Sequence, residues 1–165
     1  MCGKGSGQFR AGAHNLSPDI ITLTTVIGSL EKDIEGRGSK AKIDSVFADA
    51  VEMQIILPSD SMDTKWEIDL SGMSLPVARA ACRFIVKRLD TTDPQDLSLI
   101  TGIGRHHENP KYASTTALRE HVKEVLLSDF DLPLLSILAE RAPGVVVVEK
   151  SSIKNWQKKS GLAKE

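Results

Sequence analysis

The chain has 165 residues, of which 41% are hydrophobic and 26% are charged, a composition typical of a folded globular protein. This length suits one domain of ordinary size, or a small domain with an appendage. No apolar run approaches the roughly 18 residues that cross a membrane, and the amino-terminal stretch lacks the apolar block of a secretory signal. Because the chain begins abruptly, we expect it to be the tail of a longer protein.

The net charge is −1 and is unevenly spread. Residues 1–62 contain 6 basic and 8 acidic residues, residues 63–150 contain 11 and 13, and residues 151–165 contain 4 and 1. A dedicated nucleic-acid-binding protein is usually more basic, so such binding would depend on a local patch. Cys2 and Cys82 lack partner ligands at metal spacing, which argues against a disulfide framework or a zinc site and favours a reducing compartment.

The first part of the chain predicts a helical hairpin. Residues 1–17 are rich in glycine and serine and are predicted to be disordered. From Ile20 to Leu30 apolar residues recur at helical spacing, although their β-branched side chains leave a strand as the alternative. After a charged loop, a second helix is predicted from Ser39, with an apolar stripe at Ile43, Val46, Phe47, Ala50, Val51 and Gln54. Residues 18–62 would thus form a hairpin that needs a neighbour to bury both apolar faces.

An α/β pattern follows over residues 63–150. Alternation from Trp66 to Leu70 predicts a half-buried strand, and Ser74 is a predicted N-cap for the next helix. Leu97–Ile100 predicts a second strand, and after a loop another helix opens at Thr115 or Thr116. The inward residues of that helix are predicted to be Leu118, Val122, Val125 and Leu126.

The end of the chain completes the predicted sheet. Residues 132–139 are compatible with a strand or a helix, and Pro133 favours a strand. The four valines of 145–148 predict a strand that is buried on both faces. The order β-α-β-α-β-β indicates an α/β (α+β) fold, a two-layer sandwich with helices on one face of a mixed sheet. Residues 151–165, polar and basic apart from Trp156, predict a tail.

Three clusters of glycines and polar residues follow the predicted strands. Ligands of open α/β sheets bind beyond the carboxyl ends of strands, and glycine lets a phosphate approach the backbone. The clusters are Asp69, Ser71 and Gly72; Thr101, Gly102 and Gly104; and Arg105, His106, His107 and Lys111.

Each cluster has a functional and a structural interpretation. Asp69 is a candidate to bind a metal or steer a nucleophile, and alternatively it caps the turn that follows; Glu108 is the nearest second carboxylate. The glycine turns would either cradle a phosphate or only allow the backbone to make a tight turn. His106 and His107 are candidate general bases because imidazole titrates near neutral pH, and alternatively they are exposed loop residues.

The motifs Ile68-Asp69-Leu70-Ser71-Gly72, Thr101-Gly102-Ile103-Gly104 and Leu118-Arg119 occur in this order. The set resembles the small MutS-related (Smr) domain, whose strands end in Leu-Asp-x-His-Gly and Thr-Gly-x-Gly and whose next helix opens with Leu-Arg. The resemblance extends over residues 66–149 and implies a domain that acts on nucleic acid.

The resemblance also implies roles for single residues. Some family members nick DNA or cut RNA, which would make Asp69, His106 and His107 catalytic, with Mg or Mn as the possible cofactor and no assigned metal ligand. Ser71 stands where the family has His or Arg, and a serine cannot act as a base near neutral pH. We therefore expect a domain that binds nucleic acid, and by the resemblance this nucleic acid is RNA. One alternative is a metal-assisted endonuclease, and another is a non-catalytic protein-interaction module. The implied nucleic-acid contacts are Ser71, Gly72, Thr101, Gly102, Gly104, Arg105, Lys111 and Arg119.

The hairpin carries a second resemblance. Residues 18–27 are similar to the opening of a pentatricopeptide (PPR) repeat, and Lys40 to Gln54 followed by Pro58 is similar to its end. This resemblance implies that Thr24 contacts an RNA base, with Ser59 or Asp60 as its partner. Repeats of this family followed by an Smr domain occur in organelle RNA proteins, which implies single-stranded RNA as the partner, no membrane, and a chloroplast or mitochondrial location.

Overall fold

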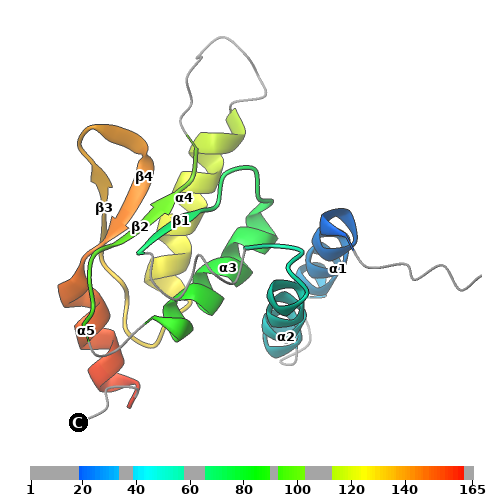
Figure 1. The fold of residues 1–165 in the computed structure, drawn as a ribbon, viewed down its shortest axis with the longest axis horizontal. Coiled ribbons are helices and arrows are strands. Elements are labelled where there is room, and N and C mark those ends of the chain that lie inside the picture. Colours follow the sequence, from blue (N-terminus) through cyan, green and yellow to red (C-terminus); the bar gives the residue numbers. More distant parts are fainter. Residues whose placement is uncertain (1–18, 34–38, 58–65, 90–92, 103–112, 162–165) are drawn as a thin grey trace, which may run out of the picture.

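The structure is a computed structural model that describes residues 19–33, 39–57, 66–89, 93–102 and 113–161. It confirms the predicted fold class, because helices cover one face of an open mixed sheet (Figure 1). The elements in chain order are α1 (Ile20–Lys32), α2 (Ser39–Glu52), β1 (Glu67–Asp69), α3 (Leu75–Arg88), β2 (Leu97–Ile100), α4 (Ala113–Ser128), β3 (Ser136–Ala139), β4 (Ala142–Val148) and α5 (Lys150–Lys159).

The sheet has the strand order β1-β2-β4-β3. β1 and β2 are parallel, and β4 runs antiparallel to both β2 and β3. Val146 and Val148 are fully buried under the helices, whereas Val145 and Val147 are only partly buried on the opposite face. The prediction that the valines are buried on both faces is therefore wrong, because the helices cover one face only.

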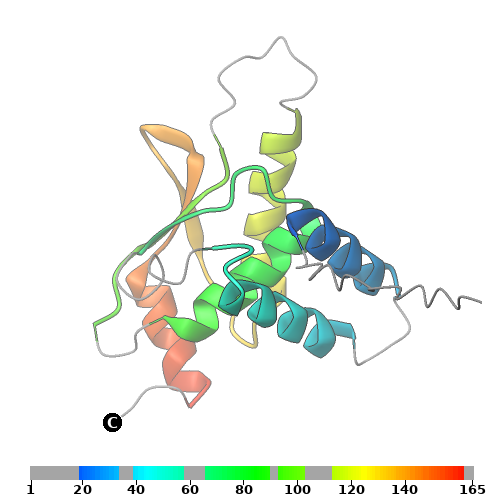
Figure 2. The same ribbon diagram turned by 45° about the vertical axis from the view of Figure 1, so that its right-hand side comes forward.

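The helical hairpin forms a third layer, and α3 lies between it and the sheet (Figures 1 and 2). Phe47 of α2 meets Phe84 of α3 edge to face, with ring centroids 5.4 Å apart. The hairpin thus has the neighbour that its apolar faces require, and the first segment is a helix, not a strand. Gln54, predicted as part of the α2 stripe, instead follows the helix with φ 58° and is exposed, because α2 ends at Glu52.

An ion network joins the hairpin to the α/β unit. Arg83, on the hairpin side of α3, donates to Asp44 of α2 at 2.6 Å and to Asp129 after α4 at 2.9 Å. Arg79 donates twice to Asp129, at 2.9 and 2.7 Å, and once to Glu31 of α1 at 3.3 Å. Burial alone would raise the pKa of Asp129, but the hydrogen bonds from Arg79 and Arg83 outweigh burial and lower this pKa to about 2. The carboxylate of Asp129 therefore stays ionised at neutral pH.

Residues 150–159 form helix α5, so the prediction of a tail over 151–165 is wrong for them. Ile153 and Trp156 are buried, and the Trp156 ring meets Phe130 edge to face at 5.9 Å. The hydroxyl of Ser152 accepts a hydrogen bond from the Leu135 N–H at 2.8 Å. One apolar turn and one buried hydroxyl thus dock an otherwise polar helix.

Candidate functional site

The candidate site lies at one edge of the sheet, where β1 and β2 both end. Because these strands are parallel, their carboxyl ends meet there, and the Leu70 N–H donates to the Ile100 carbonyl at 2.8 Å. The start of β4 joins the same edge, since the Thr101 N–H donates to the Gly144 carbonyl at 2.8 Å. We call the surface formed by residues 69–73, 101–102 and 141–144 the glycine edge.

The turn after β1 is held by the Asp69 side chain. Its Oδ1 accepts the Ser71 N–H at 2.8 Å, and the Met73 N–H donates to the Leu70 carbonyl at 3.1 Å. Gly72 has φ +79°, a region that favours glycine, and a Cβ placed there would meet no heavy atom within 4 Å. The turn is exposed, so a ligand could approach its backbone closely. Asp69 has the turn-capping role that was the structural alternative, and this bond occupies one of its oxygens.

Thr101 supports the edge from inside. Its side chain is fully buried, and its hydroxyl donates to the Gly144 carbonyl at 2.9 Å. Gly102, which follows, has φ +100° and is half-buried. Thr101 therefore fixes the position of Gly102, while Gly102 is the member of this pair that a ligand can reach.

Two arginines border the glycine edge. Arg119 of α4 donates through Nη1 to the Pro143 carbonyl at 3.2 Å and through Nε to Glu120 at 3.1 Å. Hydrogen bonds from Lys123 and Arg119 lower the pKa of Glu120. Arg141 lies in the turn between β3 and β4. Ile100, at the end of β2, pairs with Val145, and β4 begins three residues before Val145, at Ala142, so Arg141 lies at this edge of the sheet. Arg141 was not predicted from the sequence, because its position depends on the register between β4 and β2.

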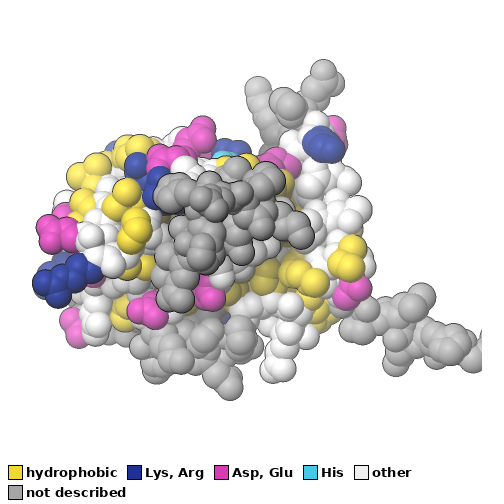
Figure 3. Space-filling view, turned by 90° about the horizontal axis from the view of Figure 1, so that it is seen from above, with side chains coloured by type: hydrophobic (Ala, Val, Ile, Leu, Met, Phe, Trp, Pro, Cys, Tyr) yellow, Lys and Arg dark blue, Asp and Glu magenta, His cyan; other side chains and the backbone are white. Residues whose placement is uncertain are grey.

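Figure 3 views the molecule from the glycine edge. Basic, acidic and hydrophobic side chains are interspersed there around a region that the structure does not describe. Among the described residues, the edge therefore offers single cations and backbone turns to a ligand.

Other predicted residues are not brought to this edge or lie outside the described residues. Thr24 is on α1, in the hairpin layer, and its hydroxyl donates to the Ile20 carbonyl of its own helix at 2.8 Å. The following predicted site residues lie outside the described part of the chain: Ser59, Asp60, Gly104, Arg105, His106, His107, Glu108 and Lys111.

Buried polar atoms without a hydrogen-bond partner among the described residues were not predicted from the sequence, and they include Gln157 Nε2 on α5. Ser74, confirmed as the N-cap residue of α3, has a buried Oγ that finds no partner within the described structure, and the same is true of His121 Nε2 on α4. Within the described ranges, no three His, Cys, Asp or Glu side chains are grouped to hold a metal ion.

Comparisons with protein-family models, curated proteins and solved structures gave no match to this chain. Across the described helices, none has both the length and the apolar character required to cross a membrane.

Proposed function

We propose that the chain binds single-stranded RNA at the glycine edge, as an Smr-like module next to a PPR-like hairpin, and does not cleave it. The observation that carries the proposal is the convergence of two positive-φ glycines, Gly72 and Gly102, with Arg119 at one edge of the sheet. This edge is where open α/β sheets bind their ligands. On the same family resemblance, the RNA would belong to a chloroplast or a mitochondrion.

The chemistry of the edge suits a phosphate backbone. Gly72 leaves open space for a phosphate oxygen, and α3 begins three residues later, at Leu75, with the positive end of its dipole toward this turn. Arg141 adds an exposed side chain of the kind that forms paired hydrogen bonds with phosphate. Arg119, already bonded to Glu120 and Pro143, adds its Nη2 group as a further donor. Such contacts position a nucleic acid without reading its sequence.

The same geometry favours binding over catalysis. Asp69 Oδ1 accepts the Ser71 N–H, so this carboxylate holds the turn. Ser71 offers a hydroxyl where proton transfer near neutral pH would need an imidazole or a similar base. The candidate general bases predicted from the sequence, His106 and His107, lie outside the described residues.

Binding of a labelled oligouridylate to the full chain tests this proposal. For single strands the logarithm of affinity changes with the logarithm of salt by about 0.7 per phosphate neutralised. The Arg119→Gln/Arg141→Gln double variant should therefore reduce the salt slope by about 1.4, and lose the most affinity at low salt. The matched control removes two charges from the hairpin, Lys32→Gln/Lys42→Gln, and should bind as the wild type does.

Three outcomes would contradict the proposal. The first is no RNA binding by the wild type, and the second is equal binding by the double variant and its control. The third is cleavage of RNA or supercoiled DNA with Mg²⁺ or Mn²⁺ that Asp69→Ala abolishes, which would establish the endonuclease alternative. A melting curve for each variant separates loss of binding from loss of folding.

A further inference from the structure

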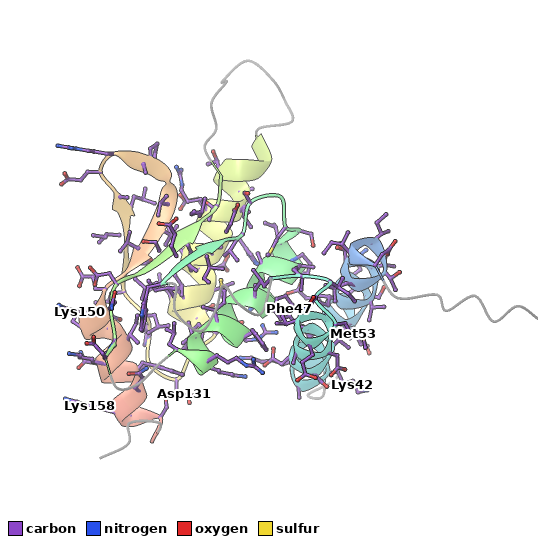
Figure 4. The ribbon with its side chains drawn as sticks, viewed as in Figure 1. Lys42, Phe47, Met53, Asp131, Lys150 and Lys158 are labelled. Atoms are coloured by element: carbon purple, nitrogen blue, oxygen red, sulfur yellow. The ribbon has the colours of Figure 1, made fainter. Side chains whose placement is uncertain are left out.

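Helix α5 carries a line of exposed positive charge. It contains four lysines and no acidic residue, and three of them, Lys150, Lys154 and Lys158, follow each other at intervals of four. All three are exposed, and Figure 4 shows Lys150 and Lys158 on the side of α5 that faces away from the rest of the molecule. We call these three residues the lysine ridge; their attachment points are about 6 Å apart along the helix.

The ridge is held in place by the buried side of the helix. Ile153 and Trp156 are buried, and Ser152 bonds to the backbone of Leu135. The apolar side of α5 is thus occupied by the protein core and cannot insert into a lipid surface in the manner of an amphipathic membrane helix. What α5 offers to a partner is a rigid row of ammonium groups.

Several cations of the other helices are paired, although Lys32, Lys42 and Arg88 form no ion pair among the described residues. Arg79, Lys87 and Lys123 each form an ion pair with a carboxylate. The three ridge lysines form no ion pair with any carboxylate in the described part of the chain. Like charges at a spacing of four residues disfavour a helix, and so does a cation such as Lys150 in its first turn. Lys158, in the last turn, is favoured by the helix dipole, but the repulsion between neighbouring lysines of the ridge remains. An anion bound along the ridge would reduce this repulsion.

We propose that the lysine ridge is a second RNA-binding surface that contacts the phosphate backbone. The inference rests on the proposed function, because it takes the same RNA as the partner. β4 connects the two surfaces: it starts at Ala142 beside the glycine edge and ends at Val148, just before α5. At about 3.3 Å per residue this path is about 20 Å long, which one RNA strand can span. A single row of charges matches a strand of phosphates better than a plane of lipid headgroups.

The test is the salt dependence of oligouridylate binding by the full chain. The Lys150→Gln/Lys154→Gln/Lys158→Gln variant should reduce the salt slope by about 2. Between 50 and 200 mM salt, the wild-type affinity should therefore fall about 20-fold more than that of the variant. A control variant with the same loss of charge, Lys32→Gln/Lys42→Gln/Arg88→Gln, should keep the wild-type slope. The melting temperature of the ridge variant should stay the same or rise, because repulsion within α5 is relieved.

The outcomes separate this inference from the proposed function. If the ridge variant keeps the wild-type slope while the Arg119→Gln/Arg141→Gln variant loses affinity, the ridge proposal is wrong and the glycine edge stands. If only the ridge variant loses affinity, the ridge stands and the glycine edge fails. Absence of RNA binding by the wild type overturns both, and binding of phosphatidylserine vesicles in its place would identify a lipid surface as the partner.

Discussion

Asp129→Asn tests whether the ion network holds the hairpin against the α/β unit. The substitution keeps the size of the side chain and one oxygen acceptor, but removes the charge. In the native protein, Asp129 accepts two hydrogen bonds from Arg79 and one from Arg83. The variant therefore leaves two guanidinium groups without their shared counter-charge.

The size of the effect follows from burial. The side chain of Arg83 is 4% exposed and that of Asp129 is 6% exposed, so their pair is shielded from water. Breaking a buried ion pair by removing one partner costs about 3–5 kcal/mol. Asp44 still pairs with Arg83 at 2.6 Å, and Arg79 is 36% exposed, so part of the charge stays compensated. We expect a loss of about 2–3 kcal/mol in the free energy of unfolding.

Urea unfolding followed by tryptophan fluorescence measures this loss. With a slope near 2 kcal/mol per molar urea, the midpoint should fall by about 1–1.5 M. Glu120→Gln is the matched control: this carboxylate also has two cationic partners, Arg119 and Lys123, but is exposed, so its removal should leave the midpoint unchanged. Equal midpoints for Asp129→Asn and Glu120→Gln would refute the reasoning.

Three further predictions concern stability and reactivity. Because arginine hydrogen bonds outweigh burial and lower the pKa of Asp129 from 3.8 to about 2, its stabilising contribution is complete above pH 4 and disappears as the pH falls toward 2. Between pH 4 and pH 2, the free energy of unfolding of the wild type should therefore fall by about 1–2 kcal/mol more than that of Asp129→Asn. Parallel curves of unfolding free energy against pH for the two proteins would contradict the lowered pKa of Asp129. Burial raises the pKa of the Cys82 thiol to about 12, so in the Cys2→Ser variant a thiol reagent should react only as fast as the protein unfolds; rapid labelling of the native protein would argue against the burial. Trp156→Ala should cost about 3–5 kcal/mol in thermal unfolding, whereas the exposed neighbour Asn155→Ala should cost little; equal effects would mean that α5 is not docked.

The predicted helices and strands that were found share a strong periodic signal. In α1, α2 and α4 the buried residues recur at helical spacing, and β2 spans the predicted residues 97–100. Helix α5 was missed because only Ile153 and Trp156 mark its apolar side, and these are too few to define a period. Burial on one face of Val145–Val148 could not be predicted either, since it depends on which side of the sheet the helices cover.

The candidate site was predictable only in part. Strand ends and glycines identified Gly72 and Gly102, whose positive φ values are local properties of the turns. The burial of Thr101 depends on Gly144, which comes 43 residues later in the chain. Arg79 and Arg83 likewise gain their partners from elements far apart in sequence, so a single sequence cannot reveal the network that they form.

Hydrogen–deuterium exchange with and without saturating oligouridylate tests the central claim most directly, since it locates the bound RNA on the chain. The account predicts slower exchange for the amides of 70–73 and 101–102, with no change in the amides of α1 and α2. RNA binding that leaves exchange in both glycine turns unchanged would contradict it.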